Sequence, residues 1–361
     1  MAFSLSMYPI SYVAQFNPST GKWDEKWFQA DSITFDQLSK MSDAEQAKVY
    51  ANRNKFDLPL VNYTTQYALG CFEGMKAYPQ KDGSLSLFRP NRNAKRFCNS
   101  MKGLYAPGFP EDLYIKASIE FLKRNKELGY IPSYNPEWEK DTFAGADAVY
   151  VRPFMYSEGA IGVGISHAPY VVICATTVSS YFKGTNTKAV VTDRIRATPK
   201  GTGWIKCASN YVVSALAKKE AEEAGFMEVI FLDATERRFI EEGSSCNIFF
   251  LLRNGTLVTP SLGDTILPGI TRASVLELAK AAGVTVNERK VTIQEVMKKC
   301  VECFVTGTAA GITPIESVTY NGVETVFNNR CPGELGKKLQ AQLKGIQYGT
   351  IADTNVWNVK V

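Results

Sequence analysis

The chain has 361 residues, of which 45% are hydrophobic and 21% are charged, and its net charge is +5. Basic and acidic residues are spread along the sequence, which argues against nucleic-acid binding, and no apolar run approaches the ~18 residues of a membrane span. The single histidine, His167, excludes most histidine triads and multi-histidine metal sites, so no metal is expected.

In the first half of the chain, strand and helix signals are mixed. Polar and apolar residues alternate over 84–88, as in a half-buried strand, and apolar residues recur at helical spacing over 91–105. Another helix is predicted over 113–128, ending near Gly129. Two apolar runs, 148–154 and 170–176, are typical of strands. The polar, glycine-containing stretch that follows them suits a domain linker.

The second half begins with a predicted helix over 210–224, with Ser209 as its N-cap and Gly225 as its stop. A second helix, over 270–282, follows the sequence Leu-Pro-Gly. Strands are predicted over three segments, namely 228–233, 239–242 and 247–252.

Two Asn-Gly pairs predict β-hairpins in the second half. Asn254-Gly255 and Asn321-Gly322 each lie between apolar runs, which is the strongest short hairpin signal. These antiparallel pairs, without a regular alternation of strand and helix, favour an α+β fold over a doubly wound sheet.

The eight cysteines are expected to be free thiols in a cytoplasmic protein. The N-terminus lacks the basic and apolar regions of a signal peptide, which supports that compartment. Cys300 and Cys303 form a CxxC, but a zinc site needs two further ligands. The pair is therefore interpreted as two thiols at a helix-to-strand junction, and any further role is left open.

Four stretches of the second half combine chemistry-bearing residues with small ones. Lys206 lies in the stretch 198–211, just before a helix and in apolar surroundings, where desolvation lowers the pKa of an amine. Lys200 in the same stretch is the other candidate for a reactive lysine. Glu241 and Glu242 precede a Gly-Ser turn, and one of them facing inward would neutralise a buried cation. The other two stretches, 267–272 and 306–311, expose backbone N–H groups, the first of them at a helix start that suits an anion.

Together with three stretches of the first half, these four resemble the branched-chain amino acid aminotransferases, which are fold-type-IV pyridoxal phosphate enzymes. The first-half stretches are 72–77 (FEGMKA), 88–90 (FRP) with Arg96 shortly after, and 150–153 (YVRP). The similarity runs in the family's order and spacing from about Phe28 to Tyr348. It rests on several coincident motifs, each of which alone would be weak.

The resemblance implies a cofactor site built around Lys206. This lysine would form a Schiff base with pyridoxal 5'-phosphate and then move the α-proton, Tyr211 would bind the phenolic oxygen, and Glu242 would pair with the ring nitrogen. Asn210 and Ser245 would be close neighbours with less defined roles. The residues that would hold the phosphate are Arg96, Ile270, Thr271 and Thr308. Without the family context, Arg96 would be read as a surface arginine and Tyr211 as part of a helix core.

The resemblance also implies a pocket that accepts an aliphatic amino acid or glutamate. Arg152 would meet the distal carboxylate of glutamate, and backbone N–H groups near Ala309 and Ala310 would meet the α-carboxylate. Family members are dimers, and Val163 would reach the partner's pocket. The aromatic lining would consist of Phe28, Tyr67, Phe72, Tyr150 and Tyr181.

The implied fold is α+β with two domains. A smaller N-terminal α/β domain would span 1–180, a linker 181–193, and a larger pseudo-barrel domain that anchors the cofactor 194–361. The implied activity is transfer of the amino group between leucine, isoleucine or valine and 2-oxoglutarate by a cytoplasmic homodimer. Neither the preference among the three substrates nor the biosynthetic or catabolic direction follows from the sequence, and an assembly larger than a dimer stays open.

Three alternatives remain open at this point. D-amino acid aminotransferase and aminodeoxychorismate lyase share the fold and the cofactor, but the long N-terminal half and the stretch 150–152 favour the branched-chain type. The third alternative is a non-catalytic binding module, which the presence of Lys206 and Glu242 disfavours. Vertebrate members carry a redox CxxC after the Thr-Gly-Thr-Ala type of loop, whereas this chain reads Ala310-Gly-Ile-Thr313 there, so that switch is not implied.

Overall fold

The computed structural model describes residues 6–179 and 186–361, and the chain divides into two compact units. Unit 1 comprises Met1–Tyr181, Cys207–Ser209 and Gly345–Val361. Unit 2 comprises Phe182–Lys206 and Asn210–Lys344. The chain passes from unit 2 to unit 1 after Lys206 and returns to unit 2 at Asn210, so Lys206 is the last residue of its segment of unit 2.

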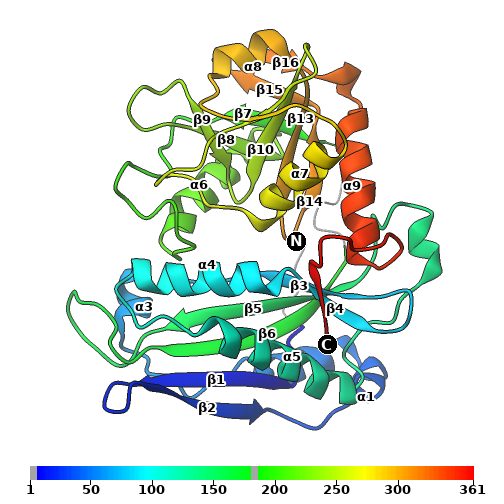
Figure 1. The fold of residues 1–361 in the computed structure, drawn as a ribbon. Coiled ribbons are helices and arrows are strands. Elements are labelled where there is room, and N and C mark those ends of the chain that lie inside the picture. The colour runs from blue at the N-terminus through cyan, green and yellow to red at the C-terminus, as the bar shows by residue number, and fades with distance from the viewer. Residues whose placement is uncertain (1–5, 180–185) are drawn as a thin grey trace. The chain divides into compact units, whose positions relative to one another are not determined.

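Unit 1 is built on a seven-stranded sheet in which every pair of neighbouring strands is antiparallel (Figure 1). The strands predicted from the first half are all present. Across the sheet, the order is β17 (Asn358–Lys360), β4 (Leu85–Phe88), β3 (Met75–Pro79), β5 (Ala148–Tyr156), β6 (Tyr170–Val178), β1 (Ile10–Asn17) and β2 (Lys22–Gln29).

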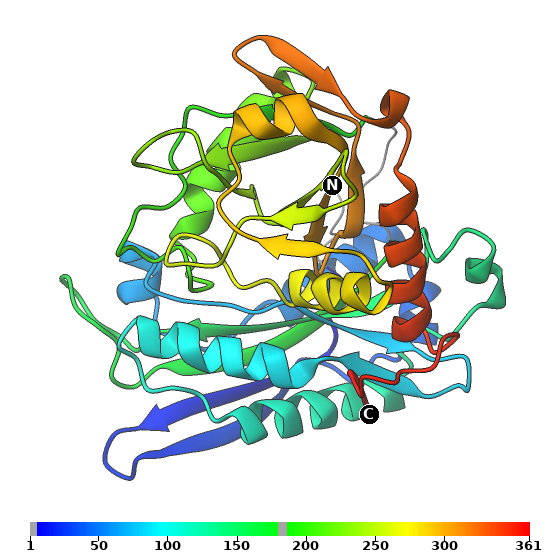
Figure 2. The ribbon, with the colours of Figure 1, turned by 45° about the horizontal axis from the view of Figure 1, so that its top comes forward.

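The two long helices of unit 1 confirm the predicted ones and pack against each other, and α5 also packs against β1 (Figure 2). Helix α4 runs over Pro90–Gly103 and α5 over Glu111–Glu127. The apolar side chains of Ala94, Phe97 and Met101 are fully buried on α4. The shorter helices are α1 (Phe35–Ser39), α2 (Asp43–Arg53), α3 (Tyr63–Tyr67) and the 3-10 turn η1 (Pro136–Glu139).

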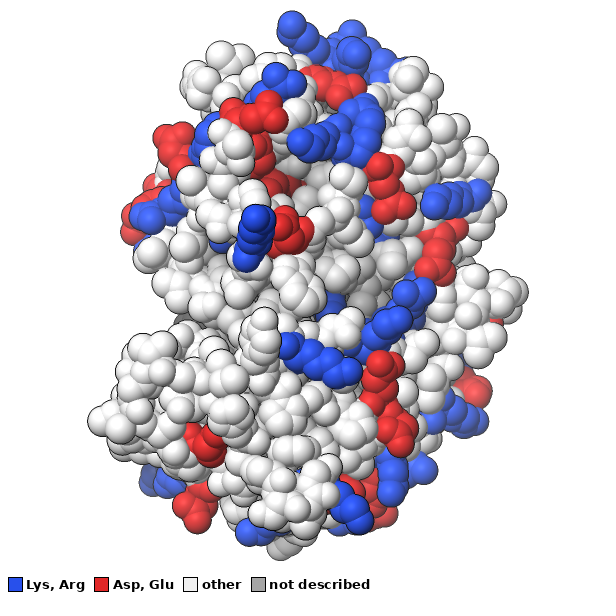
Figure 3. Space-filling model, turned by 60° about the vertical axis from the view of Figure 1, so that its left-hand side comes forward, with Lys and Arg blue, Asp and Glu red and all other residues white. Residues whose placement is uncertain are grey.

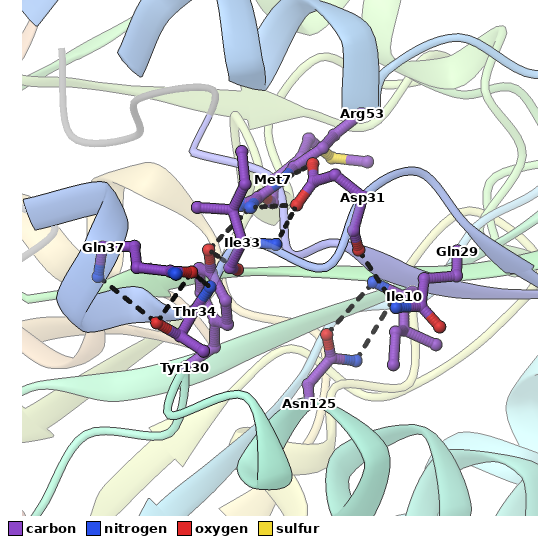
Figure 4. Close-up of polar contacts among 10 residues, drawn as sticks. All are labelled: Met7, Ile10, Gln29, Asp31, Ile33, Thr34, Gln37, Arg53, Asn125 and Tyr130. Carbon is purple, nitrogen blue, oxygen red and sulfur yellow. Dashed lines mark hydrogen bonds and ion pairs between the residues drawn. The ribbon is translucent and has the colours of Figure 1, made fainter. Parts of the chain in front are cut away.

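A buried arginine fastens the segment that follows β2, as Figure 4 shows. Arg53 donates to both oxygens of Asp31, with Nε–Oδ2 at 2.8 Å and Nη2–Oδ1 at 2.9 Å. It also donates to the carbonyl of Met7 at 3.0 Å and to the hydroxyl of Tyr130 at 2.6 Å. These contacts join α2 to the two ends of the β1–β2 hairpin, and so help to fix the strand that carries Phe28.

Unit 2 contains two five-stranded sheets. The first has the order β12 (Val286–Glu288), β11 (Leu257–Thr259), β10 (Asn247–Leu252), β13 (Cys300–Gly307) and β14 (Gly311–Ile315). The second has the order β16 (Val323–Val326), β15 (Ser317–Tyr320), β7 (Lys188–Val191), β8 (Glu228–Leu232) and β9 (Ile240–Gly243). One apolar core contains side chains from both sheets, including Ile230, Ile248 and Val305, all fully buried.

Both predicted hairpins are confirmed. β10 pairs with β11 across Asn254-Gly255, where Gly255 has φ +80°. β15 pairs with β16 across Asn321-Gly322, where both residues have positive φ, as a type I′ turn requires. Three pairs in unit 2 are parallel, namely β11–β12, β7–β8 and β7–β15.

The predicted helices of unit 2 are present as α6 (Asn210–Glu223), which packs against β8, and α7 (Ile270–Ala281), which contacts β13. Gly225 has φ +84°, as a residue that stops a helix often does. The other helical segments, none of them predicted, are α8 (Ile293–Lys299), the 3-10 turn η2 (Asn328–Arg330) and α9 (Glu334–Gln347), whose residues from Gly345 onward belong to unit 1.

The cysteines behave as expected. All eight are free, and Cys300 follows the last residue of α8 and begins β13, so the CxxC does lie at a helix-to-strand junction. Seven of the eight are buried, and Cys331 is exposed. Within residues 6–179 and 186–361, no cluster of His, Cys, Asp and Glu is arranged to hold a metal ion.

The course of the chain differs from the predicted domain limits at two places. Residues 188–191, placed in a linker from their polar surroundings, form β7 in the middle of a sheet, because a four-residue strand gives too short a pattern to recognise. Residues 345–361, placed in the second domain, belong to unit 1, where β17 pairs with β4. In the part of the chain that the structure describes, no helix has the length and apolar character needed to cross a membrane.

Candidate active site

Lys206 ends a glycine-containing loop of unit 2, four residues before α6, and its side chain is half-buried. Its Nζ donates to the hydroxyl of Tyr211 at 2.6 Å. Lys200, the competing lysine, is exposed and contributes its backbone N–H to the carboxylate of Asp264 at 2.5 Å. Of the two lysines, only Lys206 therefore has the phenol predicted for the site beside its amine.

The side chain of Asn210 fastens the loop that presents Lys206. Its Nδ2 donates to the carbonyl oxygens of Thr202 and Ile205, at 2.7 and 3.0 Å. Its Oδ1 accepts from the hydroxyl of Thr202 at 2.6 Å. Because the same residue begins α6, the loop and the helix that carries Tyr211 are held in one arrangement.

The carboxylate of Glu242 lies inside unit 2, with the residue only 5% exposed. Oε1 is 2.8 Å from Nη2 of Arg196, and Oε2 accepts from Nδ2 of Asn247 at 3.0 Å. Burial raises the pKa of Glu242 to about 7, against the lowering effects of Arg196, of the Leu267 backbone N–H and of Lys206. Glu242 therefore changes its charge near neutral pH, within electrostatic reach of the lysine.

The neighbouring Glu241 is also buried but has different partners. Burial raises its pKa, while a hydrogen bond with Thr265 and the charge of Arg196 lower it. One of its oxygens, Oε2, is buried without a hydrogen-bond partner among the described residues. Glu242 thus differs from Glu241 in its contacts, which are with Arg196 and with Asn247 beside the start of α7.

The start of α7 adjoins the same asparagine that contacts Glu242. Its N-cap is Gly269, which offers no side chain to the first-turn N–H groups, and a Cβ there would overlap Oδ1 of Asn247. Ile270 and Thr271 form the first turn and are buried. The uncapped N–H groups and the positive end of the helix dipole make this turn suitable for an anion.

Two turns meet at the end of the β10–β13 pair. Thr308, Ala309 and Ala310 form the turn between β13 and β14. A Cβ on the preceding Gly307 would lie 3.7 Å from the carbonyl oxygen of Ser245, which is an exposed residue of the β9–β10 turn. Because Asn247 pairs with Thr306 in the sheet, these turns lie at the strand ends next to the start of α7.

The structure thus brings the predicted residues of unit 2 together through hydrogen bonds, strand pairing and electrostatic interactions. Lys206 is linked to Tyr211 and Glu242, Glu242 to Asn247, and Asn247 to the start of α7 and to β13. This arrangement offers an amine, a phenol, a buried acid and a helix start suited to an anion in one region.

In unit 1, Arg96 lies on α4 and is 9% exposed, so it is not a surface arginine. Its Nε and Nη2 donate to the two oxygens of Glu73 at 2.6 and 2.9 Å. Asn93 donates to the same carboxylate at 2.7 Å. The guanidinium is therefore held in a fixed orientation inside unit 1.

Three other predicted residues of unit 1 form one cluster. Arg152 donates to the hydroxyl of Tyr150 at 2.8 Å, and its guanidinium lies 4.7 Å from the ring centroid of Phe72. Tyr150 and Arg152 are two residues apart on β5 and so share a face. A Cβ on Gly74 would overlap the hydroxyl of Tyr150, so glycine is required for this close approach.

The remaining predicted residues of unit 1 are more scattered. Phe28 on β2 is half-buried against Phe56, with ring centroids 5.1 Å apart. Tyr67 ends α3 and is 45% exposed, and Val163 is 90% exposed in the loop between β5 and β6. Tyr181 lies outside the described residues.

Three residues that contact the predicted ones received no role from the sequence. Glu73 pairs with Arg96, and Arg196 and Asn247 both contact Glu242. Glu73 lies in the recognised stretch 72–77, and Asn247 ends the stretch 239–247 that contains Glu241 and Glu242, so their positions were signalled but not their partners. Arg196 lies 46 residues before Glu242, and no periodicity relates the two.

Charged side chains of both signs are interspersed on the face of the molecule drawn in Figure 3. Exposed ion pairs of the chain include Arg194 with Glu220 in unit 2. In unit 1, Lys81 pairs with Glu139 in the same way.

Residues 70–318 match the family described as amino-transferase class IV. The chain is 40% identical over 306 residues to a probable branched-chain-amino-acid aminotransferase of Staphylococcus aureus strain N315, covering 82% of this chain and 81% of the relative. A branched-chain aminotransferase structure from Thermoproteus uzoniensis, with norvaline, superposes with a TM-score of 0.72 at 24% identity, covering 97% and 98% of the two chains. Another, from T.th. and complexed with N-(5'-phosphopyridoxyl)-L-glutamate, has a TM-score of 0.69 at 27% identity and covers 84% and 93%. The two-domain α+β fold expected from the resemblance is thereby confirmed at the level of fold class.

Proposed function

Because the chain belongs to the class IV aminotransferases and, within them, to the branched-chain-amino-acid aminotransferases, we propose that it transfers the amino group of leucine, isoleucine or valine to 2-oxoglutarate. We propose further that it does so with pyridoxal 5'-phosphate held on Lys206. The observation that carries this proposal is the Lys206 amine, hydrogen-bonded to Tyr211 and within electrostatic reach of a buried acid whose pKa is about 7.

The residues of unit 2 fit the cofactor. A carboxylate has about four acceptor sites, and Glu242 uses three of them for Arg196, Asn247 and the Leu267 N–H. One acceptor site is left for a further donor, and the proposed donor is the protonated ring nitrogen. When bound, pyridoxal phosphate supplies a ring that withdraws electrons from the carbon bearing the amino group.

Lys206 then acts as the group that holds and moves the proton. Its Nζ lies 2.6 Å from the Tyr211 hydroxyl, so the phenol orients the amine and shares its hydrogen bond. Asn210 keeps the Lys206 loop against α6, which holds Nζ in place while a proton moves to or from it. General acid–base catalysis of this kind depends first on such positioning.

The phosphate is assigned to the start of α7. Ile270 and Thr271 offer the first-turn N–H groups and a hydroxyl, and Thr308 and Ser245 lie on the two adjoining turns. Arg96 belongs to unit 1, and its assignment to the same phosphate stays a prediction. Its fixed pairing with Glu73 supports that role, since it orients the guanidinium in advance.

The substrate side chain is assigned to the cluster on β5. A guanidinium meets a carboxylate with two parallel hydrogen bonds, and Arg152 is the cation of this cluster. Tyr150 and Phe72 supply aromatic surface for an aliphatic side chain, with Phe28 and Tyr67 proposed beside them. The T.th. complex with a phosphopyridoxyl-glutamate supports glutamate as one of the two amino acids. The N–H groups of Ala309 and Ala310 are proposed for the α-carboxylate.

We also propose that the protein acts as a homodimer in the cytoplasm. In unit 1, Leu60, Ile161 and Val163 are more than 80% exposed, and the Val61–Ala160 hydrogen bond joins their two loops. Glu158 holds the second loop by accepting from the N–H of His167 at 2.8 Å. An apolar edge held in this way suits coverage by a second copy, with Val163 reaching the partner's site. Sedimentation of Val163→Asp should show a monomer, and an unchanged dimer would refute this assignment.

The activity is tested by following the absorbance of the protein loaded with pyridoxal phosphate on separate additions of L-leucine, L-glutamate and D-alanine. L-leucine and L-glutamate should each convert the cofactor to its amine form, and 2-oxoglutarate should reverse the change. A response to D-alanine but not to L-leucine would favour a D-amino acid aminotransferase. Lyase activity on aminodeoxychorismate without transamination would favour the other fold relative, and no spectral response to any of these would favour a binding module.

A further inference from the structure

Arg196 joins three segments of unit 2 that carry proposed site residues. It follows β7, and its Nη2 lies 2.8 Å from Oε1 of Glu242 on β9. The same nitrogen donates to the carbonyl oxygen of Thr265, which precedes the α7 start, and lies 3.5 Å from that of Gly203 in the Lys206 loop. One guanidinium thus contacts Glu242, the loop that carries Lys206 and the segment that leads to the first turn of α7.

Both partners of this ion pair are buried, each with a side chain 6% exposed. A carboxyl group in such surroundings loses its hydration and tends to keep its proton. Arg196 is the strongest of the groups that favour the charged form of Glu242. A guanidinium stays protonated at any pH at which the protein is folded, so this support does not vary with pH.

We propose that Arg196 is a positioning residue for Glu242, keeping its carboxylate ionised and in one orientation so that it can accept a hydrogen bond from the protonated ring nitrogen of the cofactor. The proposal rests on the proposed function, and it deepens it by naming the residue that sets the state of the acid. Asn247 contributes to the orientation but carries no charge, so it cannot replace Arg196 in holding the carboxylate ionised.

The other charged and titratable groups around Glu242 act in both directions. Lys206 lowers its pKa and Glu241 raises it. Arg272 on α7 and the Cys246 thiol also interact electrostatically with Glu242. Burial raises the pKa of Cys246 well above its usual value, so that thiol is neutral near pH 7. Among the described residues, the other cations that interact electrostatically with Glu242 include Lys206, which the cofactor would engage, and Arg272, which pairs with Glu288 at 2.9 Å.

Replacing Arg196 by methionine keeps the length and apolar stem of the side chain but removes its charge. Loss of an opposite charge at this distance is expected to raise the pKa of Glu242 by about one to three units. At pH 7.5 the carboxyl group would then be mostly neutral, and the ring nitrogen would no longer face an anion. Arg196→Lys keeps a charge without the planar fork and should fall between methionine and the natural residue. The matched control is Arg194→Gln. Arg194 lies two residues before Arg196, and its replacement removes an exposed ion pair with Glu220.

The first measurement uses the full-length protein without cofactor. Carbon-13 resonances of labelled glutamate carboxyl groups are followed from pH 5 to 9, and the Glu242 signal is assigned by its loss in Glu242→Gln. The natural protein should titrate near pH 7 and Arg196→Met at least about one unit higher. An unchanged midpoint in Arg196→Met would overturn the proposal.

The second measurement uses pyridoxal phosphate labelled with nitrogen-15 in the ring, bound to the same proteins at pH 7.5. The ring nitrogen should be protonated in the natural protein and in Arg194→Gln, and should lose its proton in Arg196→Met, whereas a residue with only a structural role would leave its shift unchanged. If Arg196→Met does not fold, Arg196→Lys decides by the same readouts, and no change in either would refute the proposal. If the natural protein takes up no cofactor, the proposed function fails, while the glutamate titration still decides whether Arg196 sets the charge of Glu242.

Discussion

Arg96 of α4 and Glu73, two residues before β3, form a two-point ion pair inside unit 1, with Nε–Oε1 at 2.6 Å and Nη2–Oε2 at 2.9 Å. Glu73 is fully buried and Arg96 nearly so. Removing one partner of such a pair leaves an uncompensated charge in the interior, which is far more costly than losing a surface pair.

We therefore expect Glu73→Gln to lower the free energy of unfolding by roughly 3–5 kcal/mol, by denaturant titration at pH 7. The matched control is Glu120→Gln, which removes an exposed pair with Arg124 one helical turn away and should cost less than about 1 kcal/mol. Equal costs for the two variants would show that the buried pair is not structurally important.

The Lys206 loop contains a glycine whose replacement tests how tightly the loop is packed. A Cβ on Gly203 would lie 2.7 Å from the Cβ of Ala197 and from Cα and O of Thr265, so backbone would have to move. Gly203→Ala should destabilise the protein by about 1–3 kcal/mol and weaken cofactor binding, because the loop carries Lys206.

Gly263→Ala is the control for this substitution, since a Cβ there meets nothing within 4 Å. It should leave both the thermal unfolding midpoint and the affinity for pyridoxal phosphate nearly unchanged. If Gly263→Ala lowered the unfolding midpoint and the cofactor affinity as much as Gly203→Ala, tight packing around Gly203 would not explain the effect of its replacement.

The two adjacent acids of β9 should differ in their effect on catalysis. Glu242 is within electrostatic reach of Lys206 and contacts Arg196, whereas Glu241 bonds to Thr265. Glu242→Gln should slow the single-turnover reaction with L-leucine by ~100-fold or more, because a neutral amide does not hold the ring nitrogen protonated, and Glu241→Gln by less than about tenfold. A reversed order would place Glu241 at the ring nitrogen.

Glu242 also predicts how the stability of the cofactor-free protein depends on pH. Its pKa is raised from 4.5 to about 7, so the folded state holds the proton more tightly than the unfolded state. Its contribution to stability is therefore full below pH 4.5 and is lost as the pH rises to about 7, by roughly 3 kcal/mol in all. The unfolding free energy of Glu242→Gln, measured at pH 5 and 8, should lack this loss; the same pH dependence in both proteins would contradict the assignment.

Arg152→Gln should impair the reaction of glutamate much more than that of leucine. Burying the distal carboxylate of glutamate without a cationic partner costs several kcal/mol, and a neutral amide cannot offer two parallel charged hydrogen bonds. Leucine presents no charge there, and Tyr150 and Phe72 remain as apolar surface. The measurement is kcat/KM for each half-reaction, and equal losses would make Arg152 a brace for β5 only.

Local signals predicted much of this fold. The Asn-Gly pairs predicted both hairpins of unit 2, and helical spacing predicted α4 and α6. Local stop and start signals predicted α5, which ends near Gly129, and α7, which follows Leu-Pro-Gly. The β1–β2 hairpin and the helix α9 were missed. Strand β2 shows why, since its burial pattern has exposed residues in succession and no regular alternation. Strand β13 is buried along most of its length, so its sequence does not alternate between polar and apolar residues either.

Site residues could be predicted where they belong to a recognisable motif. They could not be predicted where their role depends on a contact with a residue far away in the sequence. Lys206, Tyr211 and Glu242 were named from recognisable stretches, and the first two are joined by a hydrogen bond that a five-residue spacing permits. The Arg196–Glu242 and Arg96–Glu73 pairs join residues 46 and 23 positions apart. Such pairings are set by how strands and loops pack, and a single sequence does not contain them.

The central claim is that Lys206 holds pyridoxal phosphate, and the direct measurement is reduction of the loaded protein with borohydride followed by peptide mass analysis. We expect bleaching of the absorbance band and a phosphopyridoxyl adduct on Lys206 alone, with none in Lys206→Ala, which should still fold and should have no turnover. Lys200→Ala, an exposed lysine of the same loop, should retain the adduct and the activity. An adduct on Lys200 or on any other lysine, or no adduct in the natural protein, would contradict the account.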